Sequence, residues 1–164
     1  MIETFEPDQR KRFAAFGITE ADLAALRSRT SFAEQRLPAL LGELHGGFAG
    51  WPEIQVALMD PAVHRARVEH WTRVVSGRFG EGFMASAERL AKAFYDKGVP
   101  GYAVAICHST VGAAIVRELG LEPAAKAART GPSLPWLWRF RRDGNPGAAA
   151  LASALNKAAW LDLE

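Results

Sequence analysis

The stretch of sequence that decides the fold is RARVEHWTRVVSGRFGEGFMASAERLAKAFYDKGVPGY, residues 65–102. Its second half carries an apolar stripe that repeats with the period of a helix, made of Phe83, Ala87, Leu90 and Phe94. Gly98 is typical of the position just past a helix end, and Pro100 is typical of a helix start. The stretch therefore predicts an amphipathic helix over 81–97, a stop at Gly98, and a new helix from residue 100.

Apolar residues with helical spacing extend outward in both directions from this stretch. One face carries Leu37, Leu41, Leu44 and Phe48, and another carries Val63, Arg67, His70, Trp71 and Val74 with one charged interruption. Helix starts are indicated by Asp60 before Pro61 and by two capping boxes, Thr19 with Asp22 and Ser31 with Glu34. Helices are predicted over 7–16, 19–29, 31–49, 52–58, 61–77, 81–97, 100–119 and 146–164.

Strand signals are weak, because β-branched residues are scattered and no alternating run is bounded by tight-turn residues. The fold class predicted from the residues is therefore all-α. The segment 131–147 is rich in Pro, Gly, Trp and Arg without helical period, and it is predicted to be a long loop. The final helix reaches the last residue without a stop signal, so a continuation beyond the chain is expected.

Length and composition point to a single domain in the cytoplasm. The chain has 164 residues, of which 49% are hydrophobic, so one core can form without disulfides or structural metal. The net charge of +2 does not indicate a nucleic-acid partner, and the single cysteine, Cys107, suits a reducing compartment. Neither a signal peptide nor an apolar run long enough to span a membrane is present in the sequence.

Several short motifs in a fixed order resemble those of the globin-coupled sensors of bacteria. They are His70-Trp71, Ser76-Gly77-Arg78-Phe79, Arg89-Leu90-Ala91, Gly98-Val99-Pro100 and Tyr102, and the similarity covers 13–119 and 151–163. The resemblance implies a globin-like domain of about eight helices with an extra N-terminal helix. It also implies that residues 1–164 form one sensor domain, the N-terminal part of a longer signalling protein with a C-terminal output module.

The resemblance places the family's haem ligands at altered residues. The proximal histidine would lie four residues before Gly98, where this chain has Phe94, which has no lone pair for iron. The distal tyrosine position corresponds to His45. The candidate haem slot would lie between the helices 61–77 and 81–97. Its further lining residues are Trp71, Val74, Val75 and Leu90.

These substitutions lead to the hypothesis of a sensory input domain that works without haem, with its slot filled by side chains. Two alternatives remain open: a gas or redox sensor that binds haem b through a changed ligand such as His45, and an interaction scaffold without any small ligand. No pattern of catalytic residues indicates an enzyme. The expected partner is a second copy of the chain, packed through helices 103–119 and 148–163, where small residues permit close approach.

Overall fold

The computed structural model describes residues 2–48, 50–120 and 146–159, and in these ranges the chain is helical and contains no strand. The prediction of an all-α fold is therefore confirmed. The helices are α1 (Pro7–Phe16), α2 (Glu20–Arg27), α3 (Thr30–Gln35), α4 (Leu37–Glu43), α5 (Pro52–Met59), α6 (Pro61–Val75), α7 (Phe83–Tyr95), α8 (Gly101–Glu118) and α9 (Pro146–Ala159). Two 3-10 segments are η1 (Ile2–Thr4) and η2 (Leu44–Phe48).

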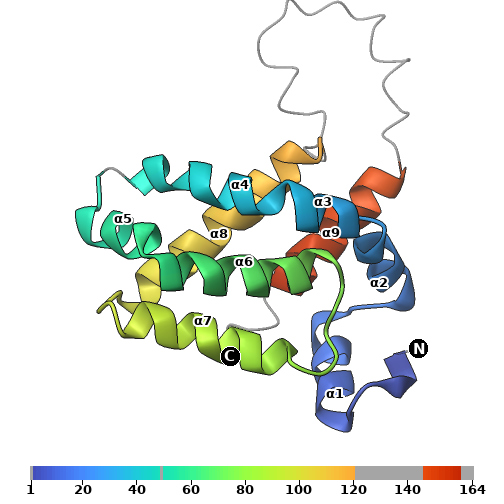
Figure 1. Cartoon of the computed structure of the whole chain (residues 1–164). Helices are drawn as coiled ribbons and strands as arrows, with labels where there is room; N and C mark the ends of the chain where they lie inside the picture. Colours follow the sequence, from blue (N-terminus) through green and yellow to red (C-terminus); the bar gives the residue numbers. More distant parts are fainter. Residues whose placement is uncertain (1, 49, 121–145, 160–164) are drawn as a thin grey trace, which may run out of the picture.

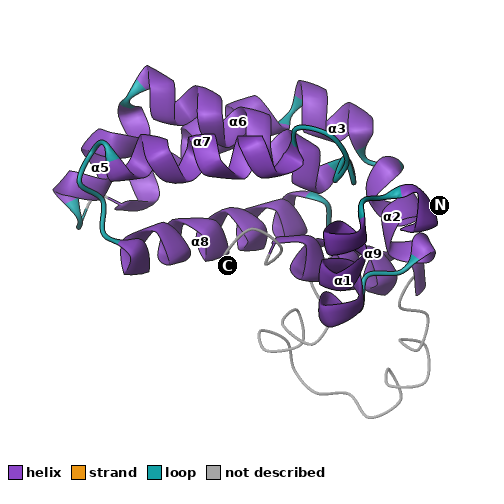
Figure 2. Ribbon diagram, turned by 90° about the horizontal axis from the view of Figure 1, so that it is seen from below, coloured by secondary structure: helices purple, strands orange, loops and turns teal. Residues whose placement is uncertain are grey.

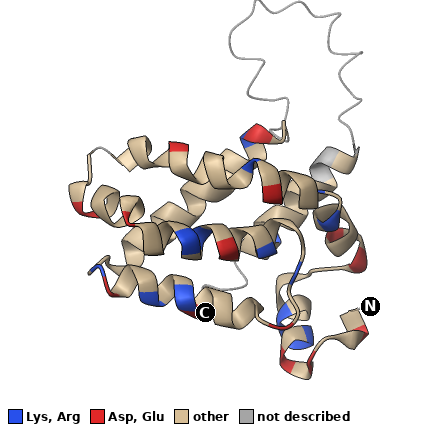
Figure 3. Ribbon diagram, in the orientation of Figure 1, with Lys and Arg blue, Asp and Glu red and all other residues tan. Residues whose placement is uncertain are grey.

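Helix α6 lies at the centre of the fold. It packs against α7 on one side and against α3 and α4 on the other, while α8 and α9 cross behind (Figures 1 and 2). The C-terminal helix α9 packs against α2, α6 and α8, so it contacts helices from the early, central and late parts of the chain. Charges of both signs are spread over the helices (Figure 3).

Local signals account for most helix ends. The backbone N–H of Asp22 donates to Thr19 Oγ1 at 3.2 Å, and Asp22 Oδ2 accepts from the Thr19 N–H at 2.9 Å, which confirms the predicted capping box. Asp60 caps α6 by accepting from the N–H of Ala62 at 2.8 Å. Gly98, with φ of +69°, lets the chain leave α7 in a left-handed conformation.

The single helix predicted over 31–49 is wrong, because the structure divides it into α3, α4 and η2. Pro38 has no N–H to donate and lies in the first turn of α4, so the helix that precedes it ends at Gln35. The capping box predicted at Ser31 is also wrong, since α3 begins at Thr30 and Ser31 lies inside it.

The C-terminal helix is tied to α2 by an ion pair across the fold. Lys157 Nζ donates to Asp22 Oδ2 at 2.9 Å, so one carboxylate both caps α2 and holds α9. Burial opposes ionisation of Asp22, but the hydrogen bonds from Lys157 and Thr19 outweigh it and lower the pKa of this carboxyl. The predicted loop 131–147 and the helix end at 160–164 lie largely outside the described residues.

The apolar interior is divided into two clusters. The larger core contains Phe13, Ile18, Leu23, Leu26, Ala33, Leu37, Leu40, Leu41, Trp71, Val74, Val75, Phe79, Phe83, Val111, Ala114, Ile115, Leu151, Ala154, Leu155 and Ala158. The smaller core contains Phe48, Ile54, Ala57, Leu58, Val63, Ala66, Leu90, Phe94, Val99, Ala103 and Cys107. Helix α6 contributes to both, so its side chains set the boundary between them.

Candidate functional site

The residues of the predicted slot are divided between the two cores. Trp71, Val74 and Val75, from the C-terminal half of α6, lie in the larger core. Leu90 and Phe94, from α7, lie in the smaller core. All five side chains are buried, and Phe94 is 3% exposed. The structure thus surrounds these residues with other apolar side chains, in two separate groups.

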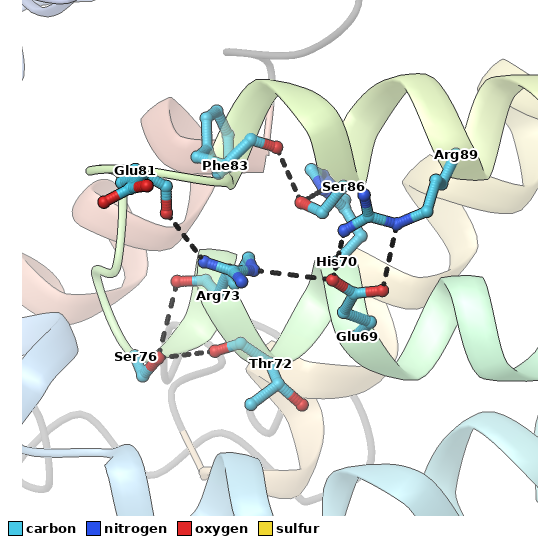
Figure 4. A network of polar contacts seen from close by, with 9 residues as sticks. All are labelled: Glu69, His70, Thr72, Arg73, Ser76, Glu81, Phe83, Ser86 and Arg89. Carbon is cyan, nitrogen blue, oxygen red and sulfur yellow. Dashed lines mark hydrogen bonds and ion pairs between the residues drawn. The ribbon is translucent and has the colours of Figure 1, made fainter.

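Polar side chains buried between the cores join α6 to α7. His70 is 0% exposed, and its Nδ1 lies 2.9 Å from Ser86 Oγ. The Ser86 hydroxyl donates to the carbonyl of Phe83 at 2.6 Å, so its oxygen accepts from His70, which assigns the ring proton to Nδ1 (Figure 4). His70 therefore connects two helices by a hydrogen bond.

Charged side chains extend this connection at the surface of the same seam. Arg89 on α7 forms a bidentate ion pair with the carboxylate of Glu69 on α6. Arg89 Nε donates to Glu69 Oε2 at 3.3 Å, and Arg89 Nη2 donates to Glu69 Oε1. Arg73 Nη1 donates to the carbonyl of Glu81 at 3.2 Å, just before α7 begins (Figure 4). The hydrogen bond from Arg89 lowers the pKa of Glu69 and keeps it ionised. We call these contacts, with the His70–Ser86 bond, the α6–α7 seam.

Aromatic contacts fill the space beside the seam. The rings of Trp71 and His108 lie with their centroids 4.5 Å apart, and those of His70 and Phe83 lie 5.3 Å apart. His108 comes from α8, so three helices meet at this point. The arrangement is a packed junction of helices in which imidazole rings act as structural groups.

His45 lies on the other side of α6, in η2. Its ring meets the ring of His64 edge to face, with 5.9 Å between the centroids, and both residues are half-buried. His45 Nε2 and His64 Nδ1 are buried atoms without a hydrogen-bond partner among the described residues. Burial lowers the pKa of both histidines, and the positive charge of Arg67 lowers each further.

Arg67 is the buried charge of this region. Its side chain is 1% exposed, and Nη1 donates to the carbonyl of Leu41 on α4 at 3.5 Å, the limit of a hydrogen bond. Its Nη2 has no partner among the described residues. Burial lowers the pKa of Arg67 to about 10, so the guanidinium is still protonated at neutral pH. We call Arg67, His45 and His64 the basic cluster.

Sequence reasoning did not identify the basic cluster. Arg67 was recognised only as a charged interruption of an apolar face, and His45 only as the residue at the family's distal position. The signal was present, because an arginine that keeps helical spacing with Val63, Trp71 and Val74 must point inward with them. The periodicity does not say whether a carboxylate meets that arginine.

The residues present do not fit a haem held between α6 and α7 in the manner that the resemblance implies. Such a group needs the two helices to stand apart and one imidazole to face its iron. The α6–α7 seam joins the helices directly, and α7 contains no histidine. Among the described residues, no group of three or more His, Cys, Asp or Glu side chains could hold a metal ion.

Comparison with known proteins gives one match. The family model described as Protoglobin matches residues 5–164, nearly the whole chain. No curated protein and no solved structure matches the chain. None of the helices in the described ranges is long and apolar enough to cross a membrane.

Proposed function

Because this chain belongs to the protoglobin family, we propose that it is a sensory, globin-like input domain that works without haem. Residues 1–164 act as one unit that receives a signal and passes it to an output module through the terminal helices. The site residues proposed for this function are packing and positioning groups, with Phe94 in the place of the iron ligand. The domain carries no catalytic residue under this proposal.

The observation that carries the proposal is the α6–α7 seam. Opening a slot between these helices would break the bond between His70 and Ser86 and would separate Glu69 from Arg89. Breaking the first bond leaves buried polar groups unpaired, at a cost of about 1–3 kcal/mol for each such group. The contacts therefore favour a closed arrangement that haem binding would have to disrupt.

The surroundings of Phe94 support the same proposal. The phenyl ring is buried in the smaller core beside residues from α5, α6 and α8. A phenyl side chain gives apolar contacts to that core and offers no electron pair to a metal. Its position is thus suited to packing rather than to ligation.

The proposed route to the output module is α9. This helix packs against α2, α6 and α8, so a shift of α6 would displace the C-terminal helix. The ion pair of Lys157 with Asp22 would pass the same displacement to α2. The proposed partner is a second copy, which would use the helices over 103–119 and 148–163. Sedimentation across a range of protein concentrations tests this dimer, and a monomer at every concentration would count against it.

Titration with haemin tests the absence of haem. We expect no Soret band that saturates at equimolar haemin in the wild-type protein. The His45→Ala variant and its neighbour control, His64→Ala, should behave in the same way. A saturating band in the wild type that only His45→Ala removes would instead establish a haem-based sensor with His45 as the ligand.

A further inference from the structure

A buried positive charge in this molecule lacks a negative partner. The Arg67 guanidinium is 1% exposed, and its one hydrogen bond, to the Leu41 carbonyl, is 3.5 Å long. Among the residues that the structure describes, no carboxylate forms an ion pair with it. A buried guanidinium without a counter-charge is costly, because burial removes its hydration and gives little in return.

The thiol beside Arg67 does not neutralise this charge. Cys107, on α8, is close enough for its charged form to interact with the guanidinium. Burial nevertheless raises the pKa of the Cys107 thiol above its ordinary value of 9.0, even against the attraction of Arg67. At neutral pH the thiol is therefore protonated, and Arg67 keeps its full charge.

Two imidazoles lie in the same region as the guanidinium. His64 lies three residues before Arg67 on α6, so both side chains leave the same side of that helix. His45 enters from η2, directly after the helix whose Leu41 carbonyl Arg67 reaches. Arg67 Nη2, His45 Nε2 and His64 Nδ1 are all buried and have no hydrogen-bond partner among the described residues. Two elements, η2 and α6, thus bring three buried nitrogens without hydrogen-bond partners into one region, and the only acceptor recorded for Arg67 there is the Leu41 carbonyl.

The chemistry of this arrangement selects a negatively charged ligand. A guanidinium only donates hydrogen bonds, and an imidazole can donate one from either nitrogen when it takes a second proton. A metal cation would be repelled by Arg67, whereas an anion would supply both the counter-charge and the missing acceptor. His45 and His64 are half-buried, and Gly46 and Gly47 beside His45 in the chain are exposed, so this side of the basic cluster is the one nearer to solvent.

We propose that Arg67, with His45 and His64, forms a binding site for a small monovalent anion, either an inorganic halide or a carboxylate. This proposal rests on the proposed function, because the anion would be the ligand of the haem-free domain. Binding would link η2 and α6 through one counter-charge. Because α6 also packs against α9, the bound and free states would differ in how firmly the C-terminal helix is held.

The line width of the chloride NMR signal, measured on the full chain at fixed ionic strength, tests the site. We expect wild-type protein to broaden the signal and Arg67→Met to weaken chloride binding about 10- to 100-fold, since a hydrogen bond to a charged group is lost. The matched control is Arg65→Gln, which removes an exposed arginine from the same helix and should leave the broadening unchanged. Equal line widths for wild type and Arg67→Met would overturn the proposal.

Competition distinguishes the two sources of the anion. Acetate and octanoate are added separately to the chloride sample, and displacement by either narrows the signal. Displacement by octanoate at far lower concentration than acetate would identify a carboxylate with an apolar chain, and equal weak displacement would identify an inorganic anion. A bromide-soaked crystal should show the ion at hydrogen-bond distance from Arg67 Nη2, and bromide absent there would count against the site.

A second variant covers the case in which Arg67→Met does not fold. Replacing both histidines, His45→Gln with His64→Gln, keeps the arginine and should reduce chloride affinity by several-fold, because the remaining donors cannot become charged. Unchanged affinity in this variant would remove the histidines from the site. Haemin titration of the same preparations keeps the two proposals separate. A saturating Soret band refutes the haem-free domain, whereas a chloride line width that none of these substitutions changes refutes the anion site.

Discussion

The two sides of α6 differ in how their polar side chains are paired. Toward α7, His70 finds Ser86 and Glu69 finds Arg89, so donors meet acceptors along the α6–α7 seam. Toward α4 and η2, Arg67 and two histidines bring donors together with a single long bond to a carbonyl. Donors that meet acceptors between two helices are typical of a structural contact, while buried charged groups that lack partners are more often found where a ligand binds. We therefore infer packing for the side toward α7 and ligand binding for the side toward α4 and η2.

The largest effect that tests this comparison is expected at Phe94. Phe94→Ala should lower the free energy of unfolding by about 3–5 kcal/mol, because it removes a large side chain from the smaller core and leaves a cavity. Urea denaturation measures the change. The neighbouring Tyr95→Ala is the control, since that side chain is 82% exposed and its loss should be nearly neutral.

A loss below about 1 kcal/mol at Phe94 would contradict the packing argument, since it would mean that an open space already surrounds the ring. In that case the slot predicted from the sequence would exist after all. The measurement thus separates a filled interior from an empty one without adding any ligand.

A smaller effect is expected when the seam is broken. Ser86→Val removes the hydroxyl that accepts from His70 and leaves a buried N–H unpaired, which should cost about 1–3 kcal/mol of stability in thermal or urea unfolding. Ser109→Val is the matched control, because it places the same residue at an exposed position of a helix. Equal costs for the two variants would show that the buried bond contributes nothing beyond helix propensity.

The sequence predicted well what depends on neighbouring residues. The bounds of α1, the capping box at Thr19 and the glycine stop at Gly98 all follow from a few adjacent side chains, and the structure confirms them. The break at Pro38 was missed, although it too is local, because the apolar spacing continues through it. The apolar spacing shows which residues share a face, but it does not show whether one helix or several carry them.

The candidate site depends on contacts that no local pattern contains. The sequence placed Arg67 on an inward face, but its lack of a carboxylate is decided by α4 and α8, which lie far away in the chain. In the same way, the spacing of Trp71, Val74, Leu90 and Phe94 predicted two apolar faces. It did not predict that these faces would join two separate cores. Only the tertiary arrangement determines which side chains meet.

The smallest effect is expected from the titration of the basic cluster. His45 and His64 face each other and Arg67, with the neutral Cys107 beside the arginine, and both imidazole pKa values lie below the ordinary 6.5. As the pH falls, the two imidazoles therefore take up protons at a higher pH in the unfolded chain than in the folded chain. The stability contributed by these groups is complete above pH 6.5 and is lost progressively below it. The pairing of Asp22 with Lys157 does not interfere, since its contribution is lost only below about pH 3.8.

Urea unfolding of wild type and of the double variant His45→Gln, His64→Gln, followed between about pH 7 and pH 5, measures this dependence. The wild type should lose stability toward pH 5, and the variant should lose less. Chloride should reduce the wild-type loss, because an anion beside Arg67 makes protonation of both imidazoles easier in the folded state. If chloride does not change the pH dependence of wild-type stability, no anion binds at the basic cluster. The two sides of α6 would then both be packing contacts.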